Sequence, residues 1–440
     1  MSFVSRALSF LRPEVAFALM TRGTQALTML AAAVCVAWRL NLEEQGLFFV
    51  FMSLGALLQL CDFGLAYAVL QTASHLRSDG DAARFARFRR RGHTINLIAL
   101  AIAAPAVGVA GALIFSANGG ANSGAADWAG PWVVFTIAVF AMQLANLELV
   151  IVEGGRSVVE AWRVRFVQES IGGFVFIGAL VAGAGLWSLS CYWGMRALVV
   201  LPWLWRGRFH TPQHVSAGIR FDWRKEVWPF QWRMGLSMIS GFFVYQAFNP
   251  IILVEQGAAV AGRFGMSLAM MNMLILVSTV WPLSQVVRFV DLIGRVRFEE
   301  LRAAFLRLLA ASTLLAMCAA GAVFGAIWWM TRMNIPFAER FADLGTTGWL
   351  LAAAVVHHVI ICFAVLLRAE RREPLLVASV AGGVLTVVAV WIAARHGVAR
   401  DVAVANLLCN ALGIPIVLAY YRGLMLRTRA PRPLTSEPAT

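Results

Sequence analysis

The sequence has few charged residues, and almost none of its basic residues is lysine. Charged side chains make up 14% of the 440 residues and hydrophobic ones 60%, whereas a soluble domain carries about 25% charged residues. Water cannot solvate so much apolar surface, so composition excludes a soluble globular protein and predicts a membrane protein. Lys225 is the single lysine among 37 basic residues, a bias that carries no mechanism.

Cysteine is also scarce, and no CxxC pair occurs. All six cysteines lie in apolar runs, so we expect small buried side chains with neither a disulfide framework nor a metal site. The sequence lacks a nucleotide-binding P-loop, a nucleophile elbow and a segment long enough for a sizeable external domain. These absences argue against an enzyme and favour a transporter without a bound cofactor. The cysteines are Cys35, Cys61, Cys191, Cys318, Cys362 and Cys409.

Twelve apolar runs are long enough to cross about 30 Å of hydrocarbon. The predicted fold class is therefore an all-α polytopic membrane protein of about 12 transmembrane helices, with a turn at Gly183–Gly185 between the nearly fused fifth and sixth runs. The runs are Val15–Leu40, Gly46–Leu70, Ile95–Phe115, Pro131–Val152, Phe166–Gly185, Trp187–Trp205, Phe230–Val254, Phe264–Val287, Phe305–Met330, Gly348–Leu367, Leu375–Ala394 and Val402–Tyr421.

Basic residues are concentrated in alternate connections between these runs. One set of segments holds 28 of them and the opposite set holds six. Because the lysine- and arginine-rich side is cytoplasmic, we expect both termini in the cytoplasm of a cell (inner) membrane protein. The net charge of +14 is then a signal of topology, and no nucleic-acid partner is predicted.

The longest central connection divides the runs into six and six. We expect an N-terminal six-helix lobe over residues 1–205, with a short interfacial helix near residues 3–11, and a connecting loop over 206–229. A C-terminal six-helix lobe follows over 230–422, and a disordered tail over 423–440. Two halves with an even helix count predict a parallel pseudo-repeat about the membrane normal.

Short identities hint at the register of that repeat. At an offset of 211 residues, Arg22 matches Arg233, and Glu44-Gln45-Gly46 matches Glu255-Gln256-Gly257, each tripeptide closing the first helix of its half. In this register the two arginines would face each other across the symmetry axis. A competing register aligns Gly46 with Gly262.

Three arginines lie inside the runs, where a charge costs roughly 2.5–3.5 kcal/mol on insertion scales. They are Arg22, Arg196 and Arg233. A guanidinium facing a cavity offers paired donors to a phosphate or pyrophosphate, so these residues are candidates for binding an anionic substrate. The alternative is that Arg22 and Arg233 extend to the cytoplasmic headgroups, since both lie near a cytoplasmic span end.

Acidic and amide side chains also lie in the runs. Asp62, Glu148 and Glu169 could bind H⁺ or Na⁺ and couple transport to an ion gradient, or they could only balance the arginines; the second interpretation has at least equal weight for Glu169, and a cavity role is favoured for Asp62. Gln25, Gln59 and Asn146 are candidate polar groups of a cavity, although most amides in membrane helices bond to neighbouring helices. Gln59 shares a helix face with Asp62, and Asn146 shares one with Gln143. Adjacent His357 and His358 face different sides, which argues against a metal site. Pro250 predicts a bend near the external end of the seventh run.

The N-terminal third carries a family resemblance. Glu43-Glu44-Gln45-Gly46-Leu47-Phe48-Phe49-Val50-Phe51, Asp62-Phe63-Gly64-Leu65 and Gln71-Thr72-Ala73-Ser74-His75, together with Phe264–Arg288, resemble the Wzx-type polysaccharide flippases of the multidrug/oligosaccharidyl-lipid/polysaccharide (MOP) exporter superfamily. The resemblance implies a MATE-like fold of two six-helix lobes around a cationic cavity. It also implies that Arg22 and Asp62 line that cavity. The chain lacks the extra C-terminal helix pair of fourteen-helix relatives, which weakens a role with lipid II.

These observations predict a flippase. The expected substrate is an isoprenoid-diphosphate-linked oligosaccharide, moved from the inner to the outer leaflet for exopolysaccharide or O-antigen assembly. Expected partners are membrane lipids and polysaccharide polymerase machinery. Two alternatives stay open, namely a cation-coupled small-molecule exporter of the same superfamily and a membrane glycosyl-polymerase or ligase.

Overall fold

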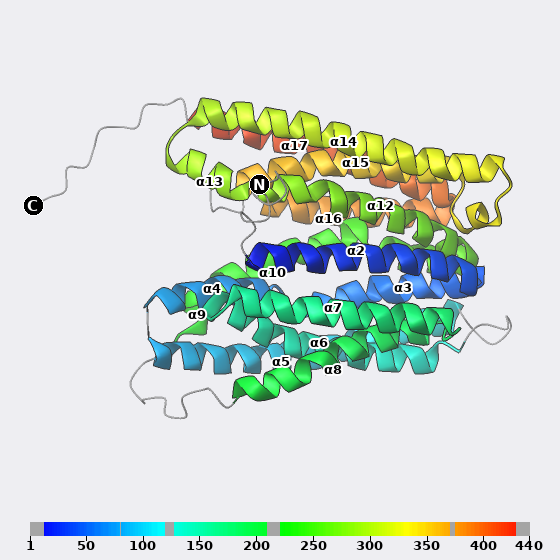
Figure 1. Cartoon of the computed structure of the whole chain (residues 1–440). Coiled ribbons are helices and arrows are strands. Elements are labelled where there is room, and N and C mark those ends of the chain that lie inside the picture. The colour runs from blue at the N-terminus through cyan, green and yellow to red at the C-terminus, as the bar shows by residue number, and fades with distance from the viewer. Residues whose placement is uncertain (1–12, 80, 119–126, 209–220, 370–374, 428–440) are drawn as a thin grey trace, which may run out of the picture. The chain divides into compact units, whose positions relative to one another are not determined.

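The computed structural model describes residues 13–79, 81–118, 127–208, 221–369 and 375–427, and every regular element in these ranges is a helix (Figure 1). The expected interfacial helix and residues 428–440 of the expected tail lie outside them. The elements are α2 (Pro13–Arg39), α3 (Leu42–Gln59), α4 (Leu65–Asp79), α5 (Ala82–Asn118), α6 (Ala129–Gly155), α7 (Val158–Val181), α8 (Trp187–Arg208), α9 (Trp223–Glu226), α10 (Trp228–Tyr245), α11 (Phe248–Gln256), α12 (Ala258–Ser284), α13 (Val286–Gly294), α14 (Phe298–Arg332), η1 (Pro336–Arg340), α15 (Leu344–Arg368), α16 (Leu376–His396) and α17 (Ala399–Arg427).

Each of the twelve predicted spans corresponds to a helix or to a broken helix pair. Within the described ranges, nine helices are long and apolar enough to cross a membrane, and the pair α10–α11, bent by 41°, makes ten. The two other predicted spans correspond to α3–α4, broken at residues 60–64, and to α8. The chain is thus an all-helical multi-pass membrane protein. The turn between α7 and α8 is confirmed, with φ of 82° at Gly183 and 54° at Gly185.

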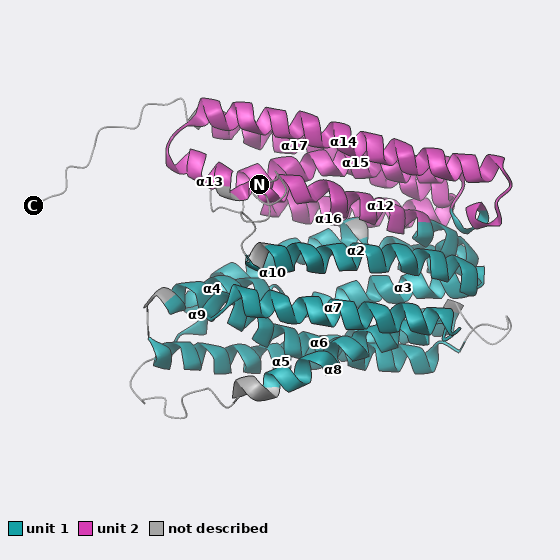
Figure 2. Ribbon diagram, viewed as in Figure 1, with its two compact units in different colours: residues 1–266, 339–341 teal, residues 267–338, 342–440 magenta. Residues whose placement is uncertain are grey.

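The described chain forms two compact units (Figure 2). Unit 1 comprises residues 1–266 and 339–341, and unit 2 comprises residues 267–338 and 342–440. The connection expected at 206–229 belongs to unit 1, and the two six-helix lobes stay a prediction. The C-terminal helix α17 continues to Arg427, so the first residues of the expected tail are helical.

Unit 1 is organised around α6, which contacts α3, α4, α5, α7 and α8. A methyl group on Gly154 would lie 2.5 Å from the carbonyl oxygen of Leu70, so glycine allows α4 and α6 to approach closely. The short helix α9 belongs to the same core, because the rings of Phe88 on α5 and Trp223 stack 5.8 Å apart. The end of the central connection therefore packs on α5 of unit 1.

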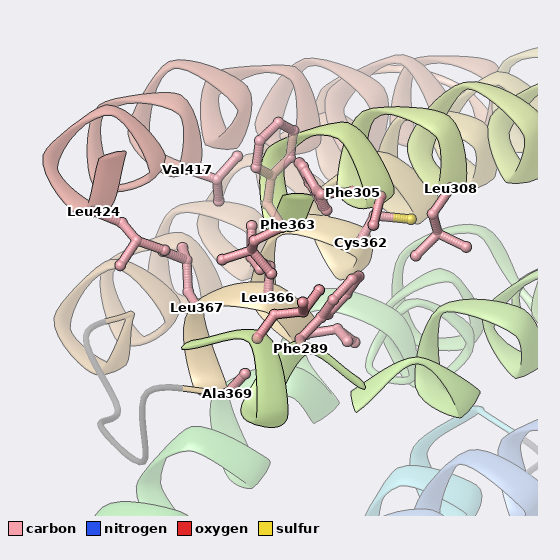
Figure 3. Close-up of a cluster of buried hydrophobic side chains, with 14 of the residues drawn as sticks. Phe289, Phe305, Leu308, Cys362, Phe363, Leu366, Leu367, Ala369, Val417 and Leu424 are labelled. Atoms are coloured by element: carbon pink, nitrogen blue, oxygen red, sulfur yellow. The ribbon is translucent and has the colours of Figure 1, made fainter. Parts of the chain in front are cut away.

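Unit 2 has an apolar core where α13, α14, α15 and α17 meet (Figure 3). Phe305 of α14 lies 5.0 Å from Phe363 of α15 and 5.4 Å from Tyr421 of α17, measured between ring centroids. Phe289 of the short helix α13 packs on Phe305 at 6.3 Å. Aromatic packing, which adds about 0.5–1.5 kcal/mol per pair beyond area burial, ties these four helices together.

Candidate functional site

Arg22 lies on α2, nine residues after the helix begins, which is about 13 Å along its axis. Its side chain is exposed, and its Nη1 donates a hydrogen bond to Gln25 Oε1 at 3.1 Å. Among the described residues no carboxylate forms an ion pair with it. Within this part of the chain, Arg22 is therefore a guanidinium without a counter-ion, and Gln25 orients it.

Arg233 lies on α10, five residues after the start of that helix, or about 7.5 Å. It is exposed, and its guanidinium carbon lies 5.6 Å from the centroid of the neighbouring Trp232 ring. No ion pair of Arg233 occurs in the described part of the chain. Because it lies closer to a helix end than Arg22 does, extension towards the headgroups remains open for Arg233.

The internal repeat follows the competing register. Leu42 begins α3 and Ala258 begins α12, and Gly46 and Gly262 each come four residues later. Gly46 and Gly262 are thus equivalent positions of the two halves. The register that matched the tripeptides is wrong, because Glu44-Gln45-Gly46 opens α3 whereas Glu255-Gln256 closes α11 and Gly257 follows it.

This change of register separates the two arginines. When Gly46 is aligned with Gly262, Arg22 corresponds to Met238, and Arg233 lies one and a half helical turns before that position. The expectation that the two arginines face each other as symmetry mates is therefore wrong. The tripeptide identity suggested a register that the helix boundaries of the structure contradict.

Arg196, the third candidate, is paired. Its Nη2 lies 3.3 Å from Glu169 Oε2, and its Nη1 donates to Tyr192 Oη, which in turn donates to Glu169 Oε1 at 2.6 Å. The Glu169 side chain is only 3% exposed. Gln168 donates to the main-chain oxygen of Arg196 at 3.0 Å. This network joins α7 to α8 and neutralises Arg196 within the membrane, as expected for Glu169.

Glu148 on α6 is also paired, with two residues that sequence reasoning missed. Arg89 approaches it with both Nη2 and Nε, at 2.7 and 2.9 Å, and His93 Nε2 lies 2.7 Å from Glu148 Oε2. Both partners lie on α5, which begins at Ala82, well before the apolar run at Ile95. Their spacing of four residues was the available signal, because it places them on one helix face.

Asp62 caps a helix instead of facing a cation. Its Oδ1 accepts from the N–H of Gly64 and its Oδ2 from the N–H of Ala66, both at 3.0 Å. Phe63 and Gly64 have positive φ, 51° and 73°, which interrupts the helix between α3 and α4, and the carboxylate accepts from main-chain donors at the start of α4. The Asp-Phe-Gly-Leu motif thus forms the break between the two helices of the second span.

The remaining polar candidates support this break. Gln59 accepts at its main-chain oxygen from Gln143 Nε2 at 2.6 Å, and its own Nε2 donates to Gly55 O at 3.3 Å. Gln143 therefore donates a hydrogen bond to one of the free carbonyl oxygens at the C-terminal end of α3. Asn146 is half-buried on α6 and makes no hydrogen bond within the described ranges. The amide of Gln143 thus bonds to a neighbouring helix, the alternative that the sequence left open, whereas the amide of Gln59 bonds within its own helix.

The bend expected at Pro250 is confirmed in position. α10 and α11 are bent by 41° at a break that immediately precedes Phe248, and Pro250 lies in the first turn of α11, where a missing N–H leaves no intrahelical bond unmade. The cysteines are free, as expected, but only Cys362 is buried, and Cys191 and Cys318 are exposed. Cysteines on the outer face of a membrane protein meet lipid, which explains the error.

The described ranges contain no group of three or more His, Cys, Asp or Glu side chains that could hold a metal ion. Of the charged candidates inside the spans, Arg196 and Glu148 are neutralised and Asp62 is satisfied by main-chain N–H groups. Arg22 and Arg233 retain guanidinium groups without counter-ions in the part of the chain that the structure describes. Chemically, this arrangement suits the binding of an anion.

No protein-family model matches the sequence, and no curated protein is significantly similar to it. Solved structures match it over nearly the whole chain. An inward-facing multidrug resistance MATE family transporter of the MOP superfamily superposes with a TM-score of 0.70 at 14% identity, covering 92% of this chain and 95% of that chain. An outward-facing MATE family transporter gives 0.57 at 15% identity, with coverage of 95% and 97%.

The lipid II flippase MurJ, in an inward closed conformation, superposes with a TM-score of 0.63 at 11% identity, covering 93% of this chain and 87% of that chain. At such identities the likeness shows the fold. The chain therefore has the fold shared by MATE family transporters and MurJ, and the MATE-like fold class is confirmed. The narrower resemblance to Wzx-type flippases stays a prediction.

Proposed function

We propose that the chain is a membrane transporter that moves an isoprenoid-diphosphate-linked oligosaccharide from the inner to the outer leaflet. The observation that carries the proposal is the pair of uncompensated guanidinium groups in the described part of unit 1. Arg22 is exposed on a spanning helix, and its hydrogen-bond partner is the neutral side chain of Gln25. A charge held inside a membrane protein without a counter-ion is costly, which favours a ligand that supplies the missing negative charge.

The balance of charges also bears on the alternative function, a cation-coupled small-molecule exporter of the same superfamily. A cavity for cationic drugs needs negative charge, yet the buried carboxylates of the described chain, Asp62, Glu148 and Glu169, already have hydrogen-bond donors or ion-pair partners. A diphosphate instead finds free donors on Arg22 and Arg233. The likeness to a MATE family multidrug transporter keeps the exporter as the second candidate. Coupling to H⁺ or Na⁺ remains a prediction of either function.

The test is a leaflet assay of the lipid-linked glycan in cells that depend on this chain. Arg22→Ala removes the guanidinium that lies deeper in its helix, and we expect the glycan to remain on the cytoplasmic leaflet, with outward movement reduced at least about tenfold. Arg22→Lys keeps the charge but loses the paired donors, so it should recover only part of the movement.

Arg395→Ala is the matched control. Arg395, like Arg233, lies beside a tryptophan near a helix end, with its guanidinium carbon 5.4 Å from the Trp391 ring, and we assign it no part in binding. It should leave flipping intact. Normal flipping by a well-inserted Arg22→Ala protein would contradict the proposal. Drug sensitivity with normal glycan would favour the exporter, and an exported but unpolymerised glycan would favour the polymerase.

A further inference from the structure

The first turns of α3 and of α12, whose residues 258–266 belong to unit 1, cross within unit 1 at a reciprocal pair of glycines. A methyl group on Gly46 would collide with the carbonyl oxygen of Ala258, the first residue of α12. A methyl group on Gly262 would collide with the carbonyl oxygen of Leu42, the first residue of α3. Each glycine thus lies against the first turn of the other helix, at equivalent positions of the repeat. The backbones touch here because neither position has a side chain.

A second pair extends the crossing by one turn. A methyl group on Gly265 would lie 2.6 Å from the Cβ atom of Phe49, and these two positions are again equivalent when Gly46 is aligned with Gly262. Here the symmetry is broken, because one helix contributes a large ring and the other none. Phe49 therefore fills the space that Gly265 leaves, and the crossing closes without a gap at that level.

Gln45 holds the crossing from its buried side. It is 0% exposed, and its Nε2 donates to Gly262 O at 2.8 Å and to Arg340 O at 3.0 Å. Arg340 in turn donates to the main-chain oxygen of Leu40 at 2.6 Å. Arg263 Nε donates to Glu339 O at 3.2 Å. Residues 339–341 therefore join the end of α2 to the starts of α3 and α12 by bonds to main-chain oxygens.

We infer that this crossing is the external closure of the transport path and that Gln45 is its latch. The inference rests on the proposed function only for the existence of such a path. The ends that meet here, the C-terminus of α2 and the N-termini of α3 and α12, lie outside the cytoplasm in the predicted topology. Polar bonds confined to main-chain oxygens can be exchanged for water when the helices part, and no ion pair links these ends within the described ranges.

The closed state also retains a defect that favours opening. Gln45 Oε1 is buried and has no hydrogen-bond partner in the described chain, and the same holds for Asn249 Oδ1 on α11. The Nδ2 of Asn249 donates to Ser53 Oγ at 3.3 Å, two turns below Gln45 on α3. Both unpartnered oxygens gain hydrogen bonds to water when the crossing opens. The two hydrogen bonds donated by Gln45 Nε2 favour the closed state, and the two unpartnered oxygens favour the open state. Such a balance is what a closure needs if it is to open in every cycle.

The experiment uses a reporter cysteine below the latch in the full-length chain. Ser53 is 1% exposed, so in a variant without the six native cysteines Ser53→Cys should react slowly with a membrane-impermeant maleimide added outside. Gln45→Leu removes both donated hydrogen bonds at similar volume and leaves two main-chain oxygens, the buried Gly262 O and the part-buried Arg340 O, without this donor, a loss that outweighs the removal of the single orphaned Oε1. We expect it to raise the external labelling rate about tenfold, the effect of two membrane hydrogen bonds.

Gly154→Ala is a control for general destabilisation, because it places a methyl group 2.5 Å from Leu70 O, in the packing of α4 on α6 and away from the crossing. It should lower thermal stability without raising external labelling. An unchanged rate in Gln45→Leu, an equal rise in Gly154→Ala, or labelling only from the cytoplasmic side would each overturn the inference. Labelling needs no cargo, so the latch can stand when Arg22→Ala leaves flipping intact and the proposed function fails.

Discussion

The described parts of the two units differ in their buried charged residues. The buried carboxylates of the described chain, Asp62, Glu148 and Glu169, all belong to unit 1. In the described part of unit 2 the buried polar side chains are neutral in type, namely serine, threonine, asparagine and histidine. Since charge is expensive in a membrane and is retained mainly for function, the contrast supports the proposal that the cargo binds in unit 1.

Unit 2 instead uses short neutral contacts to fasten its helices. His358 Nε2 lies 3.0 Å from Ser312 Oγ, which links α15 to α14. The adjacent His357 has Asn410 of α17 as its hydrogen-bond partner, so the two rings face different helices, as the sequence predicts. Ser267 and Thr347 join α12 to α15 at 3.0 Å. These bonds surround the aromatic core, and unit 2 therefore has the character of a scaffold.

The largest expected effect breaks an ion pair of unit 1. Glu169→Ala leaves Arg196 without its counter-ion, and because removing one member of a buried pair strands the other, we expect a loss of about 3–5 kcal/mol. Thermal unfolding of the purified protein in detergent measures it. The double variant Glu169→Gln/Arg196→Met removes both charges and should recover most of the loss. A single variant as stable as the wild type would show that the pair contributes nothing.

The hydrogen bond between Ser312 and His358 in unit 2 gives the comparison with the ion pair of unit 1. Ser312→Ala removes the nearer of two partners of His358 Nε2, the other being Cys362 Sγ at 3.5 Å, and Nδ1 of the same ring is already buried without a partner among the described residues. Hydrogen bonds between membrane helices average about 0.6 kcal/mol, so the same unfolding measurement should show a loss far smaller than for Glu169→Ala. A loss as large as that of Glu169→Ala would erase the distinction between the units.

The smallest effect concerns a charge at the edge of unit 2. Burial raises the pKa of Asp343. Hydrogen bonds from the Thr346 hydroxyl and from the N–H groups of Thr346 and Gly345, together with the charge of Arg400, lower this pKa by more than burial raises it. The pKa of Asp343 therefore lies below its ordinary value. A lowered pKa stabilises the folded state above the unfolded value, about 3.9, and this contribution disappears as pH falls through the folded pKa.

Asp343→Asn keeps a good helix cap but removes that charge. It should therefore be slightly less stable than the wild type at pH 7, and the two should converge as the pH falls below the unfolded value of about 3.9 and through the folded pKa. Unfolding temperatures recorded across this range test the prediction. A difference that stays constant with pH would mean that the carboxylate charge is not the cause.

The spans could be predicted because lipid demands long apolar runs, and each of the twelve runs is helical in the structure. Breaks and extensions could not be predicted with the same success. α5 begins before its apolar run, which hid Arg89 and His93 among the residues assigned to a loop. The break between α3 and α4 depends on main-chain donors to Asp62, and such donors leave no mark in a sequence pattern.

The candidate site was predicted in part. Sequence position identified Arg22, Arg196 and Arg233 as unusual, but pairing depends on which side chains the fold brings together. Glu169 and Arg196 belong to different predicted spans, and only the packing of α7 on α8 joins them. The register of the repeat failed for a related reason, since identical letters cannot reveal where one helix ends and the next begins.

The most direct test of the account is a binding measurement. Titration calorimetry with the purified chain and a short-chain isoprenoid diphosphate compares the wild type, Arg22→Gln and Arg395→Gln. We expect binding that Arg22→Gln weakens at least about tenfold, the effect of losing a charge-assisted pair of hydrogen bonds, and that Arg395→Gln leaves unchanged. Equal binding by all three proteins would contradict the assignment of anionic cargo to the unpaired arginine of unit 1.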